Sequence, residues 1–372
     1  MPRAMRIELL PARFGDCLLV ECLGQDGRRP WRMLVDGGPP DTWPLLEARL
    51  RRMPADDQAI DVVVITHIDS DHIGGIIPLL SSDLAPRIGD VWFNGLVHLP
   101  TEEGRPRSIG QGETVVSTLT GSARPGLAAG KRHGDPLPWN TAFGGGAVDT
   151  GARAGLVAVD IPGGPTITVV SPTVTQLHNL GEKWHQVVAQ AQREDRPLPE
   201  PDVLQPLTDL RALAGRKSAK DTSVANGSSI ALLVEHRGAS AVLAGDAFGP
   251  VLAAGLARIA RARKVKRLDV DAFKLPHHGS QANVSRALLA TAPAGNYLVS
   301  TNGDVFHHPD DTALPRVVTA APSPPALWFN YRTPRTERWA DPALTLRYGH
   351  SVNFPDPAHP DAGVVLELSS RP

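Results

Sequence analysis

Short hydrophobic runs, separated by turn-forming residues, fill the N-terminal third of the chain. Residues 5–10 and 17–23 flank the turn Arg-Phe-Gly-Asp and predict two antiparallel strands. Residues 31–38 predict a third strand, which ends in a carboxylate and two glycines. The run 60–66 is almost continuously apolar, which is the pattern of a strand buried on both faces. This part of the chain is therefore expected to be rich in strands.

Strand and helix patterns alternate through the rest of the chain, and strands dominate. Helical spacing is found over residues 43–53, 174–194 and 251–267. Further strands are predicted over residues 90–99, 164–172, 228–236, 239–247 and 363–369. This alternation predicts an α/β fold in which two sheets pack together with helices outside.

The length of 372 residues allows one large domain or two ordinary ones. We interpret 1–372 as a single domain with insertions at about 100–160 and 174–222. The first insertion is rich in Gly, Pro, Ser and Thr. Long insertions of this kind are usually functional, and this one is a candidate lid or partner surface.

The overall composition does not indicate a particular class of binding partner. Hydrophobic residues make up 41% and charged residues 21%, as in globular proteins. The formal net charge is -1, so polyanion binding would require a local basic patch. The chain shows no signal-peptide pattern and no long apolar run, which predicts a cytoplasmic protein without a membrane partner. Cys17 and Cys22 are expected to be reduced.

A dense cluster of polar residues follows the run 60–66. His67, Asp69, Asp71 and His72 lie within six residues of one another, before two glycines. Their nitrogen and oxygen atoms form a mixed donor set that suits Zn²⁺, Mn²⁺ or Fe. The alternative is a polar helix cap with Asp71 as the cap residue, although four candidate ligands at this density are rare in caps.

Other metal-ligand residue types follow later strands. Asp246 ends an apolar run, where a carboxylate can bridge two metal ions. The pair His277 and His278 follows a third strand, and the pair His307 and His308 follows a fourth. Each pair alone is weak evidence. Because all of them follow strands of the buried type, the pattern predicts one converging site.

The order of these motifs resembles the metallo-β-lactamase fold of metallohydrolases. Within that family, the pattern His-x-Asp-x-Asp-His is most similar to the soluble hydrolase domain of ComEC-type DNA-uptake proteins and their free-standing relatives. The other segments that carry the resemblance are Gly-Asp-Cys at 15–17, Leu-Val-Asp-Gly-Gly at 34–38, Leu-Ala-Gly-Asp-Ala at 243–247, Pro-His-His-Gly-Ser at 276–280 and His-His-Pro at 307–309. The resemblance implies a four-layer αββα sandwich of two mixed sheets with helices outside.

The resemblance also implies two divalent metal ions, Zn²⁺ or Mn²⁺, and a metal-activated water as nucleophile. The implied metal ligands are His67 and Asp69 for the first ion, Asp71 and His72 for the second, Asp246 as the bridge and His308 as the last ligand. The implied catalytic residues are Asp71, which accepts or orients a proton, and His277 and His278, which lie beside the scissile phosphate.

One departure from the family pattern concerns the first metal ion. The family has a histidine ligand after the strand that corresponds to 164–170, but this chain reads Val-Val-Ser-Pro-Thr there. His98, His133 and Asp36 are candidates to complete the site. Asp69 stands where the family usually has a histidine, which shifts the expected preference toward Mn²⁺.

The favoured function is a phosphodiesterase, most of all a nuclease acting on DNA or RNA. Six basic residues in 258–267, with further ones in 215–220 and 130–133, suggest contacts to a phosphate backbone. A solvated helix face is the alternative explanation of the first of these runs. The alternative functions are a carbonyl hydrolase, such as a lactonase or β-lactamase, and a metal-depleted module that binds nucleic acid or a partner. By analogy, free-standing relatives suggest an effector of bacterial defence with a regulatory protein partner.

Overall fold

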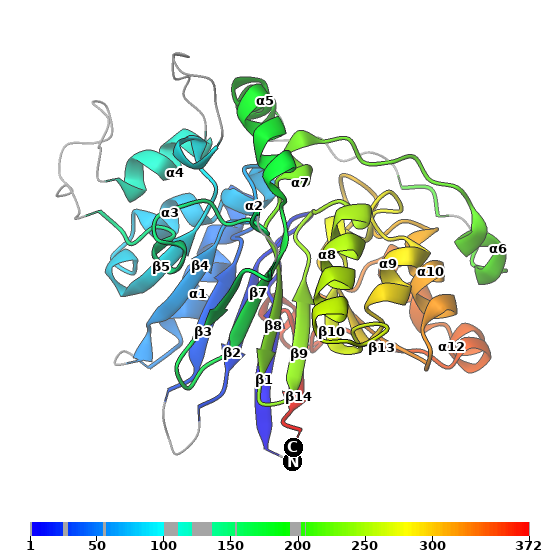
Figure 1. Cartoon of the computed structure of the whole chain (residues 1–372). Coiled ribbons are helices and arrows are strands. Elements are labelled where there is room, and N and C mark those ends of the chain that lie inside the picture. The colour runs from blue at the N-terminus through cyan, green and yellow to red at the C-terminus, as the bar shows by residue number, and fades with distance from the viewer. Residues whose placement is uncertain are drawn as a thin grey trace.

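Two β-sheets, each with helices on its outer face, form the fold (Figure 1). The computed structural model describes residues 2–24, 29–54, 57–99, 111–120, 136–152, 155–193, 202–204 and 206–371. The first sheet contains, in spatial order, β14 (Val364–Ser369), β1 (Arg3–Leu9), β2 (Leu18–Cys22), β3 (Trp31–Val35), β4 (Ile60–Val64) and β5 (Ile88–Trp92). The second contains β13 (Ser351–Asn353), β12 (Ala326–Phe329), β11 (Ala294–Val299), β10 (Val270–Lys274), β9 (Ala239–Leu243), β8 (Ala231–His236), β7 (Thr166–Ser171) and β6 (Ala158–Asp160). Both sheets are mixed, as expected.

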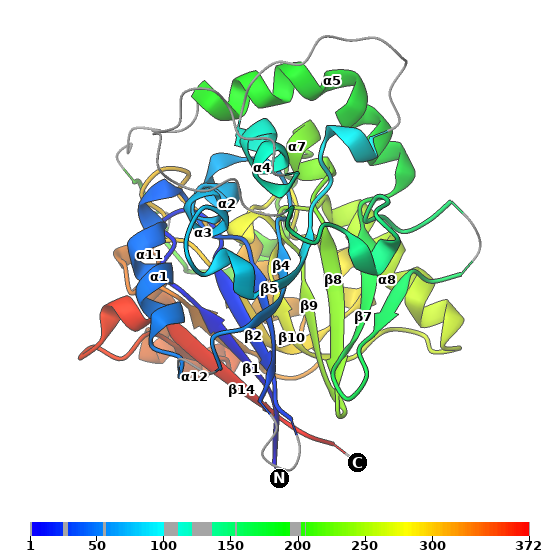
Figure 2. The same ribbon diagram turned by 90° about the vertical axis from the view of Figure 1, so that its left-hand side faces the viewer.

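Three hydrophobic layers separate the sheets and the helices. One layer lies between the two sheets, and β4 contributes Val62 and Val64 to it. A second layer, with Val63, packs the first sheet against α1 (Trp43–Arg51) and α3 (Ile76–Leu80). The third packs the second sheet against α8 (Gly249–Ala262), α9 (Arg286–Thr291) and α10 (Ala313–Ala320). The alternation along β4 explains its apolar sequence, because both faces of the strand are buried. The predicted αββα order is confirmed (Figure 2).

The direction of the strands decides where the polar loops meet. Strands β3, β4 and β5 run parallel to one another, and so do β9 to β13. The loops after β4, β9 and β10 emerge from the carboxyl ends of these strands and contact one another. This edge of the sandwich is the upper one in Figure 1, near α2 (Ser70–Ile73) and α7 (Val224–Gly227).

Two predicted elements end earlier than the sequence suggested. The strand expected over 90–99 ends at Trp92, because the backbone N–H of Phe93 donates to Asn140 Oδ1 (2.9 Å) instead of to a strand. The helix expected over 251–267 ends at Ala262. There Lys264 has a φ of 57° and the backbone turns out of the helix. Residues 263–267, with four of the six basic side chains of the run, therefore lie beyond the helix.

The two segments interpreted as insertions contain ordered elements. The first includes α4 (Gln111–Leu119) and a turn in which Asn140 bonds to the Phe93 backbone. The second includes the expected helix α5 (Val174–Arg193) and also α6 (Leu210–Gly215), where the sequence predicted a polar linker. The basic segment 130–133 lies outside the described residues.

Two smaller expectations concern the membrane and the cysteines. Among the described residues, no helix is long and apolar enough to cross a membrane. Cys17 and Cys22 are both free and buried. Burial raises the pKa of Cys22 to about 12, so this thiol is protonated at neutral pH.

Candidate metal centre

The loop after β4 brings two histidines and two carboxylates to one edge of the first sheet. The loop enters the one-turn helix α2 (Ser70–Ile73), for which Asp69 is the N-cap residue. The ring centroids of His67 and His72 lie 4.2 Å apart. Asp69 Oδ2 lies 3.4 Å from His67 Nε2, and Asp71 Oδ2 lies 3.7 Å from His72 Nε2. Each carboxylate therefore lies beside one of the two neighbouring histidines.

A polar helix cap does not account for this cluster. Asp71 lies inside α2 and not at its cap position, and the side chain of Asp69 makes no capping hydrogen bond. Both carboxylates are directed toward histidine nitrogens instead. The alternative of a polar helix cap is therefore wrong.

Asp246 joins the cluster from the second sheet. It follows β9 through Gly245, whose φ of +50° and close contacts with Ser229 and Thr66 leave no room for a side chain. The Asp246 backbone N–H donates to Ser229 Oγ (3.0 Å) and so holds the turn. Asp246 Oδ2 then lies 3.4 Å from His72 Nε2. A carboxylate between two groups of ligands is well placed to bridge two metal ions.

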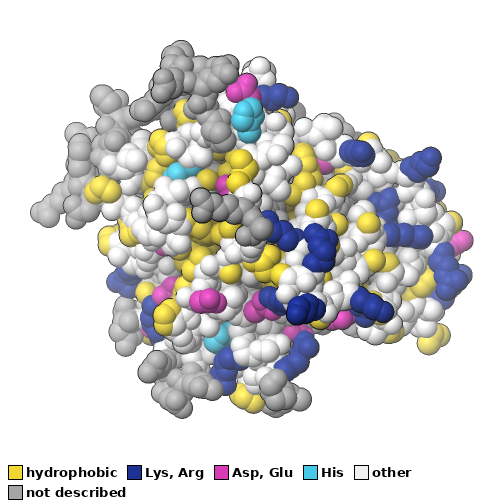
Figure 3. Space-filling model, in the orientation of Figure 1, with side chains coloured by type: hydrophobic (Ala, Val, Ile, Leu, Met, Phe, Trp, Pro, Cys, Tyr) yellow, Lys and Arg dark blue, Asp and Glu magenta, His cyan; other side chains and the backbone are white. Residues whose placement is uncertain are grey.

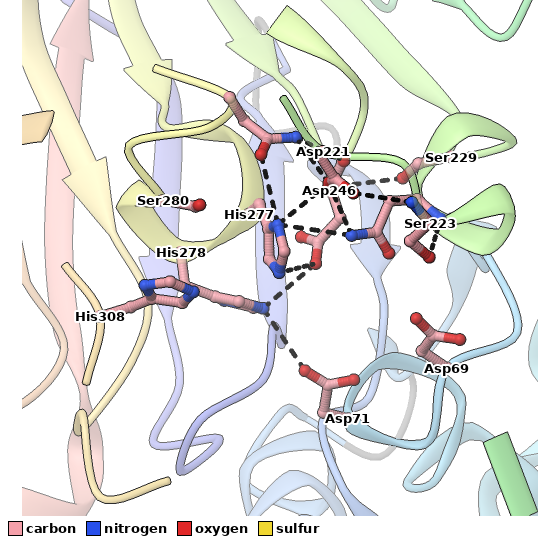
Figure 4. Close-up of polar contacts among 12 residues, drawn as sticks. Asp69, Asp71, Asp221, Ser223, Ser229, Asp246, His277, His278, Ser280 and His308 are labelled. Atoms are coloured by element: carbon pink, nitrogen blue, oxygen red, sulfur yellow. Dashed lines mark hydrogen bonds and ion pairs between the residues drawn. The ribbon is translucent and has the colours of Figure 1, made fainter. Parts of the chain in front are cut away.

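Two consecutive histidines follow β10 and face the same carboxylates (Figure 4). His277 and His278 have φ angles of 49° and 52°, in the left-handed region that few non-glycine residues adopt. His278 Nε2 lies 3.4 Å from Asp71 Oδ2 and 3.5 Å from Asp246 Oδ2. His277 Nε2 lies 3.8 Å from Asp246 Oδ2. His278 is thus among potential ligands from both sheets, and His277 is beside them.

Three of these imidazoles are held through Nδ1, and their Nε2 atoms face carboxylates without a hydrogen bond to any described residue. The contacts of Nδ1 are Asp36 Oδ2 for His72 (2.7 Å), the Ser300 carbonyl oxygen for His278 (2.8 Å) and Thr66 Oγ1 for His67 (3.0 Å). The buried Nε2 atoms of the same rings have no hydrogen-bond partner among the described residues. Metal-ligating histidines are oriented in this way, and buried polar atoms otherwise rarely lack a partner. The donor set therefore fits a divalent cation.

The charges of the cluster stabilise one another. Burial alone would lower the pKa of His72 and of His278, but neighbouring carboxylates, Asp246 first, raise both pKa values well above the ordinary range. Burial alone would raise the pKa of Asp246, but the surrounding histidines lower it well below its ordinary value. The metal-free cluster is therefore a network of imidazolium and carboxylate ions, in which a bound cation would replace protons.

The structure brings most of the predicted ligands together. Groups of three potential ligands, with their ligand atoms within 4.8 Å of one another, include His67, Asp71, His72 and Asp246 among the described residues. His278, predicted to lie beside the substrate, is also in these groups, and so is Asp16. Asp69 is not in them, although its carboxylate lies next to His67.

His308 lies next to the consecutive histidines but outside these groups. Its ring centroid is 5.2 Å from that of His277 and 6.4 Å from that of His278. Burial lowers the pKa of His308 well below its ordinary value, and the two neighbouring histidines lower it further. His308 is therefore a neutral imidazole at the rim of the centre.

Of the residues considered as substitutes for the missing histidine, Asp36 is in a group of potential ligands with Asp16 and His72. Asp36 accepts hydrogen bonds from the backbone N–H and the Oγ1 hydroxyl of Thr66 and contacts His72, so it orients a potential ligand. His98 packs edge-on against Trp139, with 4.4 Å between ring centroids, and is in none of the ligand groups found among the described residues. His133 lies outside the described residues.

Two residues at the centre were not selected from the sequence. Asp221 Oδ2 lies 3.2 Å from His277 Nδ1 and also accepts from Asn226 (2.9 Å) and Asn283 (3.1 Å). Lys274, the last residue of β10, is buried and forms an ion pair with Asp16. Asp221 follows a polar segment without a local signal. Lys274 had a local signal, since a lysine at the end of a buried strand, two residues before Pro276, is unusual.

Comparison with known proteins gave a match to one part of the chain. Residues 11–171, which include the loop after β4, are similar to the model of the metallo-β-lactamase superfamily. No match was found among curated proteins.

Three solved structures show a weak similarity to this chain. The MIM-1 metallo-β-lactamase from Novosphingobium pentaromativorans is 15% identical, with 86% of this chain and 91% of that chain covered and a TM-score of 0.30. The MIM-2 metallo-β-lactamase is 13% identical, with 86% and 90% covered and a TM-score of 0.33. A mutant of the CmlA β-hydroxylase is 11% identical, with a TM-score of 0.37; the match covers 99% of this chain and 54% of that one. Likenesses at this level do not indicate an activity.

Proposed function

We propose that this chain is a metal-dependent phosphodiesterase that acts on nucleic acid, as a DNA or RNA nuclease. The observation that carries the hydrolase part is the set of three buried Nε2 atoms around Asp246, each on a ring anchored through Nδ1. The hydrogen bonds within the site leave these three nitrogens unsatisfied, which is rare for buried polar atoms that only stabilise a fold. It fits divalent cations, for which we propose Zn²⁺ or Mn²⁺.

The residues divide into two sets of ligands that share Asp246. We assign His67 and Asp69 to one cation, and Asp71, His72 and His278 to the other. When bound, such cations lower the pKa of a water and offset negative charge on a phosphoryl oxygen. His278 takes the place that the family resemblance gives to His308, because it lies closer to both carboxylates. Because its pKa is lowered, Asp71 is suited to ligation more than to proton uptake.

His277 is the proposed general acid. Its side chain is 26% exposed, so a substrate can reach it, and Asp221 holds its Nδ1. Burial alone would lower the pKa of His277, but Asp246 and Asp221 raise it. The raised pKa favours the protonated ring, which can give its Nε2 proton to the leaving oxygen.

Cationic side chains near His277 favour a phosphodiester over an uncharged substrate. Arg216, Lys217 and Lys220 are exposed, and Lys220 directly precedes Asp221. Their segment is held in place because Arg316 donates to the backbone oxygen of Arg216 (2.7 Å). Exposed cations on a segment that leads into the centre at Asp221 are suited to contact flanking phosphates of a polynucleotide.

One exposed aromatic side chain lies at the rim. Phe306 is 46% exposed, and among the described residues it is the one aromatic side chain in the set of large exposed hydrophobic residues. Its ring stacks near His308, with 6.4 Å between centroids, and meets Phe14 edge-on at 5.6 Å. A ring supported in this way can stack with one nucleobase.

The finer parts of the proposal rest on sequence motifs. The pattern at 67–72 and Pro-His-His-Gly-Ser at 276–280 support closeness to the ComEC-type hydrolase domains. A cytoplasmic location, a regulatory protein partner and a role as an effector of bacterial defence belong to the same proposal and follow from analogy.

The experiment that tests the proposal combines metal content with substrate choice. Wild type and Asp246→Asn are purified, metals are counted by mass spectrometry, and both are incubated with single-stranded DNA, duplex DNA, RNA and bis(p-nitrophenyl) phosphate. We expect about two metal ions per wild-type chain and cleavage of a phosphodiester that Asp246→Asn lacks. Asp269→Asn is the control, because Asp269 is exposed and pairs with Arg267.

Two results would count against the proposal. A metal-loaded wild type that hydrolyses a lactone or a chromogenic β-lactam, and no phosphodiester, would assign the centre to carbonyl chemistry. A wild type that binds DNA in a salt-sensitive manner but binds no metal would make it a binding module.

A further inference from the structure

A buried lysine lies directly under the candidate metal centre. Lys274 ends β10 with a side chain that is 1% exposed, and it forms an ion pair with Asp16, whose side chain is also 1% exposed. Lys274 Nζ donates to the backbone oxygen of Gly245 (3.2 Å) and lies 3.9 Å from Asp246 Oδ1. A buried ammonium costs several kcal/mol unless it is paired, so its place here needs a reason.

The partner of the lysine connects it to the other sheet. Asp16 Oδ1 lies 3.3 Å from Nδ1 of His278, and the Asp16 backbone N–H donates to the carbonyl oxygen of Asp71 (3.2 Å). The preceding Gly15 approaches Asp71 so closely that a Cβ atom would lie 1.8 Å from its carbonyl oxygen. The loop at 15–16 is therefore pressed against the segment that carries Asp71.

The ion pair thus touches both halves of the centre. Asp16 comes from the first sheet and contacts Asp71 and His278, whereas Lys274 comes from the second sheet and contacts Gly245 and Asp246. The two carboxylates of the second proposed cation, Asp71 and Asp246, belong to different sheets. The pair joins these sheets directly beneath them.

We propose that Lys274 is a positioning residue of the metal centre, and that it acts through Asp16 and Asp246. The ion pair holds His278 and Asp246 at the separation from Asp71 at which all three can ligate one cation. This inference rests on the proposed metal-dependent function, and it assigns to Lys274 no contact with substrate.

One measurement separates this role from simple electrostatics. The Lys274 ammonium and the Asp16 carboxylate together add no net charge beside the cation site, so removing both would leave metal binding nearly unchanged if charge were their whole contribution. If the pair positions the ligands, removing both residues weakens metal binding. A merely structural pair would change folding stability and leave metal affinity unchanged.

The variants are chosen so that the protein still folds. Lys274→Met alone leaves Asp16 as an unpaired buried charge, so it is combined with Asp16→Asn; replacing both partners of a buried pair is often neutral for stability. Asp16→Asn alone is the second variant, because it removes the charge that faces His278 Nδ1 (3.3 Å) while the Ser300 carbonyl oxygen still holds that nitrogen and Lys274 keeps its contact with Asp246. Arg49→Met with Glu8→Gln is the matched control, since this pair joins α1 to β1 and makes no contact with the proposed ligands among the described residues.

Metal affinity of the whole chain is measured by competition with a chromophoric chelator for Zn²⁺ and for Mn²⁺, and unfolding is followed in the presence of a chelator. We expect the Lys274→Met and Asp16→Asn double variant to fold and to bind metal about 10- to 100-fold more weakly, as is typical when a residue that orients a ligand is removed. Asp16→Asn loses less affinity, and the control pair loses none.

Each possible result either supports the proposed role of Lys274 or contradicts it. Unchanged or tighter metal binding by the double variant, or unchanged binding by Asp16→Asn if the double variant does not fold, would overturn it. A wild type without measurable metal affinity would remove the proposed function itself. A wild type that binds metal while both variants match it would remove only the role of Lys274.

Discussion

The two edges of the strands use the same residue types for opposite purposes. At the carboxyl ends, His72 and His278 have Nδ1 anchored and a buried Nε2 without a hydrogen-bond partner among the described residues. At the other edge, His236 is also buried, but its Nε2 donates to the carbonyl oxygen of Leu23 (3.0 Å). At the remote edge the buried histidine nitrogen makes a hydrogen bond, whereas at the carboxyl ends the corresponding nitrogens make none. Metal binding and catalysis are therefore expected where buried polar groups lack hydrogen-bond partners. The presence of buried histidines alone does not indicate such a site.

The basic segments show the same contrast. Basic side chains gather over the right-hand part of Figure 3. In the run 258–267, which leads into β10 at the edge remote from the centre, Arg263 pairs with Glu235 and Arg267 with Asp269. The segment 215–220 leads instead to Asp221 at the centre. The longer run, which is the more conspicuous one in the sequence, is therefore the less relevant one.

The largest expected effect compares a histidine from each edge. His277→Asn removes the proposed general acid, so we expect kcat to fall by about 10²- to 10⁴-fold with metal content unchanged. The loss should be much smaller for bis(p-nitrophenyl) phosphate, because its leaving group needs no proton. His236→Asn removes a hydrogen bond of the fold and should lower the unfolding midpoint while kcat of the folded fraction stays the same.

Steady-state kinetics on a dinucleotide and on the activated ester, with metal analysis of each variant, check this contrast. Equal losses on both substrates for His277→Asn would argue against proton donation. A loss of metal in the same variant would make His277 a ligand instead.

Much of the fold was predictable from local patterns because each pattern has a local cause. The run at 60–66 is apolar because both faces of β4 are buried, and the periodicity over 174–194 is that of α5. The strand boundary at Trp92 was not predictable, because Asn140, far along the chain, takes the next hydrogen bond. The end of α8 depends on a left-handed residue, Lys264, that no motif marks.

The residues of the candidate centre were easier to predict from the sequence than their arrangement in space. The spacing of His67, Asp71 and His72 is local, so it could be read directly. Whether His278 or His308 lies nearer the carboxylates depends on how the loop after β10 turns, and two left-handed residues decide that turn. Asp221 reaches His277 across a segment without periodicity, so no local signal could have placed it.

The second prediction sharpens the contrast between the basic segments. Lys217→Ala with Lys220→Ala should weaken binding of single-stranded DNA and lower the slope of log affinity against log salt by about 0.7 for each phosphate that is no longer neutralised. Lys264→Ala with Lys266→Ala removes the same charge at the remote edge and should leave the slope unchanged. Binding is measured by fluorescence anisotropy with Asp246→Asn as background, so that the DNA stays intact. The reverse result would move the nucleic-acid path to the remote edge.

The smallest effect concerns pH, and its sign follows from the charges at the centre. In the metal-free protein the pKa values of His72 and His278 are raised, so the stability these residues contribute is complete below about pH 6.5, their unfolded pKa. It is lost as pH rises through the raised folded pKa values. The lowered pKa of Asp246 contributes stability above about pH 4, which is lost only as pH falls through the folded pKa. The metal-free protein should therefore become less stable as pH rises from about 6.5.

Bound metal is expected to reverse this dependence of stability on pH. Ligating histidines must be neutral, so protons compete with the cation and affinity increases with pH. Unfolding midpoints measured between about pH 5.5 and 9 should fall with pH in chelator and rise with pH in Mn²⁺. His236→Asn, at the remote edge, should keep both slopes, whereas Asp246→Asn should flatten them because it removes the main cause of the raised pKa values. Parallel curves with and without metal would mean that the unpartnered nitrogens do not bind the cation, and the contrast between the two edges would lose its chemical meaning.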